Sequence, residues 1–196
     1  MKWYEPIDCD NTVPDPFVCD TDNLEGSGLT RSDFLKGNLI EGWPDNISFQ
    51  ARKVPNDGTP DDALQNHLML PVYSERLLHA LQDERIQGLQ FLPIRVKRPN
   101  GELIPGFSIV NIINSVSALD LDHSICHRFP LDFANPNVRG KIAGIQRTVL
   151  LGDRLTGLDI IRLKDFKQSF FVSERIKNLF EINRFTGYSF EEVELS

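Results

Sequence analysis

The spacing of apolar residues over 68–96 predicts a strand, a helix and a second strand. The apolar run 68–73 has the length of a strand and ends at Ser74, whose hydroxyl can accept a hydrogen bond from a free amide at a helix start. Apolar residues then follow three-and-four spacing over 77–81, which gives a helix one apolar face. Gly88 comes just after this run, where a left-handed turn favours glycine before the next strand. The segment therefore predicts one strand–helix–strand unit.

The same pattern returns over 169–195, at an offset of 99 residues. Apolar residues persist at equivalent positions even where the residue type changes. Six positions are identical between the two copies: Ser74, Glu75, Arg76, Arg85, Gly88 and Phe91 correspond to Ser173, Glu174, Arg175, Arg184, Gly187 and Phe190. We interpret this as an internal duplication of structure, and we interpret each Ser-Glu-Arg run as a capped helix start with an ion pair.

The rest of the chain predicts strands joined by turns, with few helices. Asn100 and Gly101 favour a tight hairpin between two of these strands. The first thirty residues, rich in Asp, Asn, Pro and Gly, predict loops, and so does the segment 126–141. The predicted strands are 47–54, 91–98, 103–113, 118–121, 142–151 and 158–163, and the predicted short helices are 30–36 and 63–66.

These elements predict an α+β fold with a mixed, mainly antiparallel sheet, few helices and two repeated strand–helix–strand units. Because neighbouring strands are joined by hairpins, a sheet covered mainly on one face is favoured over a doubly wound parallel sheet. We expect an acidic, irregular N-terminal arm over 1–41, packed on or extending from the body. The α+β body then spans 42–196.

Composition is that of an ordinary globular protein, with 40% hydrophobic and 25% charged residues. No apolar run approaches the roughly 20 residues that cross a bilayer, and the N-terminus lacks the apolar region of a signal peptide. Three cysteines, an odd number, suit a reducing compartment better than a disulfide framework. We therefore expect a cytoplasmic protein without a membrane partner.

The negative charge of the chain is concentrated near the N-terminus. Residues 1–66 carry a net charge of -8, whereas residues 67–196 carry +1. Between Trp3 and Thr30 there are seven acidic residues and no basic one. Such a surface repels nucleic acid and attracts a basic partner, although an acidic run can also serve solubility alone.

Candidate catalytic chemistry is sparse. His123, Cys126 and His127 offer three ligands to a zinc ion, and Cys9 or Cys19 a fourth, but their spacing matches no standard finger. His67 and His79 stand alone. We expect no catalytic residues, no metal and no cofactor, and therefore no enzyme.

Several segments resemble one family of proteins. They are the run GWP at 42–44, YSERLLHALQDERIQGLQFLPIRV at 73–96, RPNGELIPGFSIVNIINSVSALDLDHS at 98–124 and IIRLKDFKQSFFVSERIKNLFEINRFTGYSFEEVEL at 160–195. Together they are similar to the bacterial immunity proteins of polymorphic-toxin systems, class eleven, long catalogued as a domain of unknown function. The resemblance covers roughly 42–195 and leaves the first forty residues unplaced.

The resemblance implies a cytoplasmic protein, encoded beside a secreted antibacterial toxin, that binds the toxin and neutralises it in the producing cell. If the toxin is a nuclease, its substrate groove is basic, and an acidic surface can occupy it. We therefore predict partner-binding residues in the N-terminal arm, with aromatic anchors at the centre of the interface. They are Asp8, Asp10, Asp15, Asp20, Asp22, Glu25, Trp3, Tyr4 and Phe17. Two alternatives stay open: an enzyme that reverses toxin damage, and an adaptor for toxin secretion.

Overall fold

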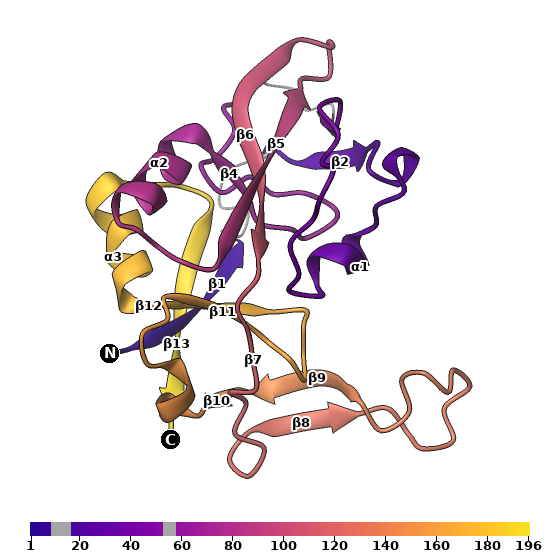
Figure 1. The fold of residues 1–196 in the computed structure, drawn as a ribbon, viewed down its shortest axis with the longest axis vertical. Coiled ribbons are helices and arrows are strands. Elements are labelled where there is room, and N and C mark those ends of the chain that lie inside the picture. Colours follow the sequence, from indigo (N-terminus) through magenta and orange to yellow (C-terminus); the bar gives the residue numbers. More distant parts are fainter. Residues whose placement is uncertain (9–16, 53–57) are drawn as a thin grey trace.

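The chain folds into three β-sheets, with three α-helices, in the part that the structure describes (Figure 1). The structure is a computed structural model and describes residues 1–8, 17–52 and 58–196. The six-stranded sheet has the order β10–β13–β1–β12–β11–β7. In that order its strands are Val149–Leu150, Tyr188–Leu195, Trp3–Asp8, Phe170–Ser173, Ile160–Leu163 and Ser115–Val116.

The other two sheets contain five and two strands. The five-stranded sheet has the order β2–β3–β5–β6–β4, with strands Cys19–Asp22, Ser48–Ala51, Leu89–Lys97, Leu103–Ile112 and Val72–Ser74. The two-stranded sheet pairs β8, Ile125–Arg128, with β9, Ile142–Arg147. The helices are α1, Arg31–Phe34, α2, Glu75–Asp83, and α3, Glu174–Asn183; short 3-10 turns are η1, Glu25–Ser27, and η2, Gly152–Leu155. Most strand pairs are antiparallel, and the parallel ones are β3–β5, β10–β13 and β11–β7.

Both large sheets bury side chains on both faces. Because successive side chains of a strand point to opposite faces, Trp3 and Tyr4 of β1 enter different cores. Tyr4 joins the apolar faces of α2 and α3 in a core that both sheets share, while Trp3 packs on the other face of the six-stranded sheet. On β6, Ile109 and Val110 divide in the same way between the outer core of the five-stranded sheet and the shared core.

The two predicted strand–helix–strand segments form β4–α2–β5 and β12–α3–β13, and their helix starts share a hydrogen-bonding pattern. The Ser74 hydroxyl donates to Asp62 Oδ1 at 2.7 Å, and the Ser173 hydroxyl donates to Asp159 Oδ1 at 2.7 Å. Ser74 also accepts a bond from the Leu77 amide, so it caps α2 as predicted. Ser173 occupies the N-cap position without a side-chain cap bond, because its hydroxyl is directed to the carboxylate.

The arginine of each Ser-Glu-Arg run joins its own unit to the other one. Arg76 pairs with Asp62 at 2.5 Å and donates to the Asn183 carbonyl, at the C-terminus of α3. Arg175 pairs with Asp159 at 3.0 Å and donates to the Glu84 carbonyl, at the C-terminus of α2. Each helix therefore places a cation at the negative end of the other helix, where it stabilises the dipole. Figure 1 shows the two helices side by side on one flank of the body.

Several element predictions hold and others are wrong. The α+β class, the mainly antiparallel pairing, the hairpin at Gly101 and the helix start at Thr30 are confirmed. The single sheet covered mainly on one face is wrong, because the strands divide into three sheets and the two large ones are covered on both faces. No helix forms at 63–66, where backbone bridges join Ala63 to Tyr73 and Asn66 to Cys19. The loops predicted for the first thirty residues contain β1 and β2, and the loop predicted for 126–141 begins with β8.

Candidate functional site

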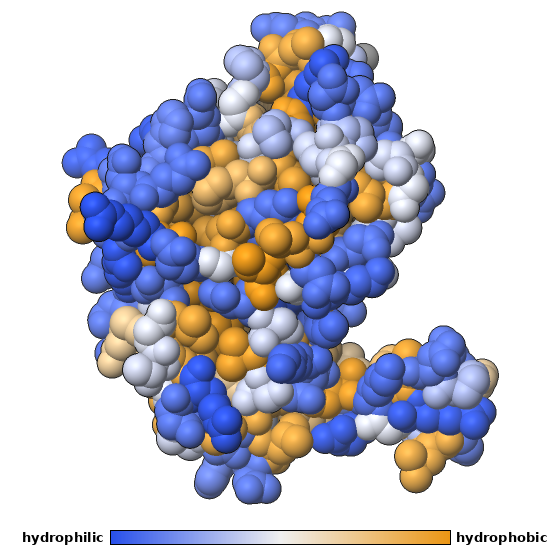
Figure 2. All heavy atoms as spheres, in the orientation of Figure 1, coloured by the Kyte–Doolittle hydropathy of each residue, from blue (hydrophilic) through white to orange (hydrophobic). Residues whose placement is uncertain are grey.

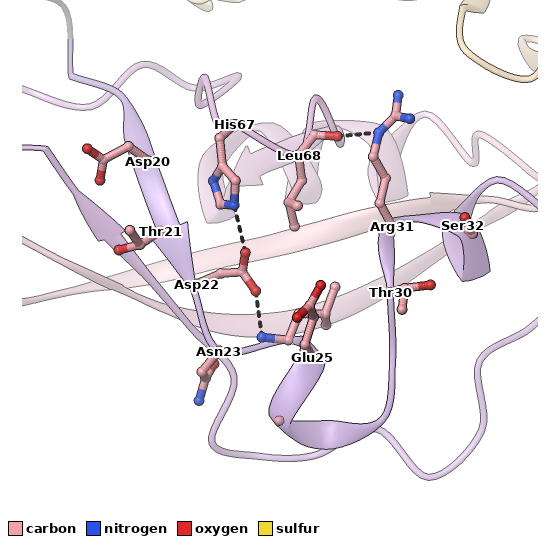
Figure 3. A pocket seen from close by; sticks show the side chains of 12 residues that line it. Asp20, Thr21, Asp22, Asn23, Glu25, Thr30, Arg31, Ser32, His67 and Leu68 are labelled. Carbon is pink, nitrogen blue, oxygen red and sulfur yellow. Dashed lines mark hydrogen bonds and ion pairs between the residues drawn. The ribbon is translucent and has the colours of Figure 1, made fainter.

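Three of the predicted acidic residues meet in a notch at the edge of the five-stranded sheet (Figure 3). Asp20 and Asp22 lie on β2, and Glu25 begins the 3-10 turn η1 that follows it. Thr30, which precedes α1, residues 31–32 of α1 and residues 67–68 complete the lining of a notch of about 540 Å³. Asp8 lies elsewhere, beside Glu5 in a second hollow, while Asp10 and Asp15 fall outside the described residues.

Asp22 holds the notch in shape. Its Oδ2 lies 2.8 Å from His67 Nε2, and its Oδ1 accepts a bond from the Leu24 amide at 2.5 Å. The other ring nitrogen of His67 faces the Cys19 carbonyl at 3.3 Å. Asp22 therefore joins the end of β2 to the segment before β4, and most of its hydrogen-bonding capacity is used within the protein.

The free negative charge belongs to Asp20 and Glu25. Both side chains are exposed, and neither forms an ion pair or side-chain hydrogen bond with another described residue. The nearby cation Arg31 donates instead to the Leu68 carbonyl at 2.6 Å and to Gln168 Oε1 at 2.9 Å, and Figure 3 shows its guanidinium directed away from the acids. Partial burial lowers the pKa of Arg31 from its ordinary value. The rim of the notch is therefore acidic.

The backbone around the notch is fixed by side-chain bonds. Asn23 accepts from the Ser48 amide at 2.7 Å and donates to the Asn46 carbonyl at 3.1 Å, which ties the end of β2 to β3. Thr30 and Asp33 form a capping box at the start of α1. Hydrogen bonds from Lys36 and from the Thr30 amide lower the pKa of Asp33 to about 2. The acids are presented on a preorganised surface.

The predicted aromatic anchors are core residues. Trp3 is 1% exposed, Tyr4 6% and Phe17 5%. Trp3 and Tyr4 lie on a strand with neighbours on both sides, and Phe17 packs in the outer core of the five-stranded sheet. The prediction that they are surface anchors is wrong, because all three side chains pack inside the body. An interface on this face must take its apolar contacts from other residues.

Comparison with protein families identifies the family of the chain. The family model of the immunity protein family Imm11 matches residues 7–195. The chain belongs to the Imm11 family. This confirms the resemblance to class-eleven immunity proteins, and membership implies that the protein neutralises a toxin. The match begins before β2, so the acidic notch lies within the matched region, contrary to the expectation that the resemblance begins near residue 42. No curated protein matches the chain.

The remaining candidate groups of this Imm11 protein are dispersed. His123 pairs with Asp120 at 2.8 Å in a turn, Cys126 is half-buried on β8, and His127 is the next, exposed residue of that strand. Burial raises the pKa of the Cys19 thiol to about 12, which disfavours the reactive thiolate. Across 1–8, 17–52 and 58–196, no three His, Cys, Asp or Glu side chains are grouped as a metal ion would need. Within the same residues, no helix has the length and hydropathy to cross a membrane.

Proposed function

We propose that this protein binds a cognate secreted antibacterial toxin, encoded by the adjacent gene, and neutralises it in the producing cell by stoichiometric occlusion. The observation that carries the proposal is the Imm11 match over residues 7–195. Inhibition by a bound surface needs a stable body and a preorganised face, and the hydrogen-bonded notch supplies such a face. The proposal makes the protein a binding partner and not an enzyme.

We further propose that the toxin is a nuclease and that the acidic notch contributes to the interface. A nuclease presents cations to the phosphates of its substrate, and exposed carboxylates complement such a groove. Asp20 and Glu25 provide this charge, supported by Asp22 from the inner wall. Charges at the rim of an interface act mainly on the rate of association.

The ratio of the two proteins at full protection tests the mode of action. Titrating the immunity protein into a fixed amount of the purified toxin domain should abolish toxin activity at a molar ratio near one, and the two should elute together in gel filtration. Protection at a small fraction of this ratio would favour an enzyme that reverses damage. A complex that leaves the toxin fully active would favour a secretion adaptor.

Neutralising the exposed acids tests the notch. The Asp20→Asn, Glu25→Gln double variant should associate with the toxin about three- to tenfold more slowly at low salt, because electrostatic steering is reduced. The difference should shrink at high salt, where charges are screened. The matched control is Asp83→Asn with Glu191→Gln, two exposed acids on α2 and β13. Equal association rates for both double variants in stopped-flow measurements would remove the notch from the interface.

We also infer that β4–α2–β5 and β12–α3–β13 are copies of one ancestral unit. The six identities at a fixed offset and the reciprocal bonds of Arg76 and Arg175 support this inference. The proposed consequence for function is a rigid pair of helices that keeps the two sheets, and thus the notch, in a fixed arrangement.

A further inference from the structure

A basic groove lies between the β8–β9 hairpin and the body. Residues 128–129 and 139–143 of the hairpin and its loop form one wall, and residues 164–168, which follow β11, form another. The groove encloses about 770 Å³. Five cations line it: Arg128, Arg139, Lys141, Lys164 and Lys167. Among the described residues that line the groove, Asp165 is the one acid. A net charge of +4 therefore gathers here, in a chain whose total is -7.

These cations are not neutralised inside the protein. Within the described ranges, none of the five forms an ion pair, whereas Arg147 at the end of β9 pairs with Glu194. Arg128 and Arg139 donate to loop carbonyls of Gly140 and Phe133, which fixes the shape of the wall. The three lysine side chains make no hydrogen bond to a described residue. Like charges held together repel one another, so an anion placed between them would be favoured.

The hairpin that forms the outer wall exposes apolar side chains. Figure 1 shows it at the lower end of the body, and Figure 2 shows it standing out from the rest of the surface. Leu131 is 81% exposed and Phe133 40% exposed in its loop. A two-stranded hairpin is marginally stable alone, and this one is held at its base by the buried Ile142 and by Cys126 packed on the adjoining core. Exposed apolar residues beside a concave charged surface are typical of an interaction site.

We propose that the groove and the hairpin tip together bind an acidic surface of the cognate toxin. This inference rests on the proposed function and adds a second contact, opposite in charge to the acidic notch. A protein surface fits better than a nucleic acid because apolar side chains of Phe129, Ile142 and Phe166 lie among the cations. An acidic protein surface can offer apolar side chains between its carboxylates, whereas a phosphate backbone offers charge alone.

Charge reversal on both walls tests the groove. Lys141→Glu with Lys164→Glu changes one exposed residue on each wall, and binding to a catalytically inactivated toxin domain should weaken about tenfold or more. The control, Arg52→Glu with Arg95→Glu, changes net charge equally at exposed positions outside the groove and should bind as the wild type does. Leu131→Ser, which leaves the charge unchanged, should weaken binding several-fold. Thermal melts of all variants separate a loss of folding from a loss of binding.

Two soluble probes identify the class of partner. A short labelled peptide of Glu, Asp and Leu should bind the wild type more tightly than single-stranded DNA of equal charge, and the Lys141→Glu, Lys164→Glu variant should lose the peptide. Tighter binding of the DNA would overturn the proposal in favour of a nucleic acid. If the groove variant binds the toxin as tightly as the wild type does, the groove proposal is wrong and the proposed function stands. If the wild type binds no toxin, the proposed function fails and the groove's role in toxin binding fails with it.

Discussion

Replacing Gly187 by alanine is expected to lower the free energy of unfolding by about 3 kcal/mol or more. Gly187 has a φ of 105°, and an added Cβ would lie 2.1 Å from the carbonyl oxygen of Ala63. That carbonyl is backbone and is fixed in place, because the Ala63 amide donates to the Thr186 carbonyl and Ala63 bridges to Tyr73. Relief of the clash therefore requires the backbone at Ala63 and the backbone before β13 to move apart. Urea denaturation followed by circular dichroism measures the effect.

Alanine substitutions at two other glycines provide a comparison for the destabilisation expected at Gly187. At Gly88, the position equivalent to Gly187, an added Cβ would lie 1.9 Å from Asn114 Nδ2. The Asn114 side chain can rotate away from this clash, but it then loses its hydrogen bonds to two backbone carbonyls. Gly157 has a φ of 75° and open space around it, so alanine there adds only backbone strain, about 1 kcal/mol. The expected order of destabilisation is Gly187, then Gly88, then Gly157. A Gly187→Ala variant as stable as Gly157→Ala would show that contact with Ala63 does not constrain this position.

Local sequence rules captured the elements whose signals are short-range. The hydroxyl of Ser74 and the spacing over 77–81 were sufficient for α2, and Asn100-Gly101 for the β5–β6 hairpin. The rules failed for β1 and β2, whose polar residues resemble loops. Strands Trp3–Asp8 and Cys19–Asp22 form because other strands supply their hydrogen bonds, from partners more than twenty-five residues away in sequence. The glycines were also only partly understood, since the left-handed residues nearest the helix ends are Arg85 and Arg184.

The candidate site was predictable in charge and not in geometry. Composition located the excess acid near the N-terminus, and the structure gathers Asp20, Asp22 and Glu25 there. The pairing of Asp22 with His67 joins residues 45 positions apart, so no local sequence pattern predicts it. The aromatic residues were assigned wrongly for a related reason. The sequence does not show whether an aromatic side chain such as Trp3 is exposed to a partner or buried in a core. The basic groove was missed because its walls come from two segments whose charges are unremarkable when counted along the chain.

The Asp62→Asn variant should lose about 2–4 kcal/mol of unfolding free energy at pH 7. Asp62 is 8% exposed and lies between the two strand–helix–strand units. Its carboxylate accepts bonds from the Ser74 hydroxyl, from Arg76, and from the Thr186 amide of the other unit at 3.1 Å. An amide has the same shape but removes the charge and places a donor where one acceptor is needed. Asp61→Asn, a half-exposed neighbour without a described side-chain bond, is the control.

The pH dependence of this loss distinguishes the charge of Asp62 from its role as a hydrogen-bond acceptor. Burial by itself would raise the pKa of Asp62, but hydrogen bonds from Arg76, Ser74 and Thr186 outweigh burial and hold the pKa below 3.8. A carboxyl group with a depressed folded pKa stabilises the fold above its unfolded pKa, and this stabilisation disappears as the pH falls through the folded value. The gap between wild type and Asp62→Asn should therefore be widest near neutrality and narrow below pH about 4, as the wild-type carboxyl is protonated. A gap that stays constant from pH 7 down to the acid limit of folding would mean that Asp62 acts through its hydrogen-bond acceptors and not through its charge. The ion pair with Arg76 would then contribute nothing measurable to the contact between the two helices.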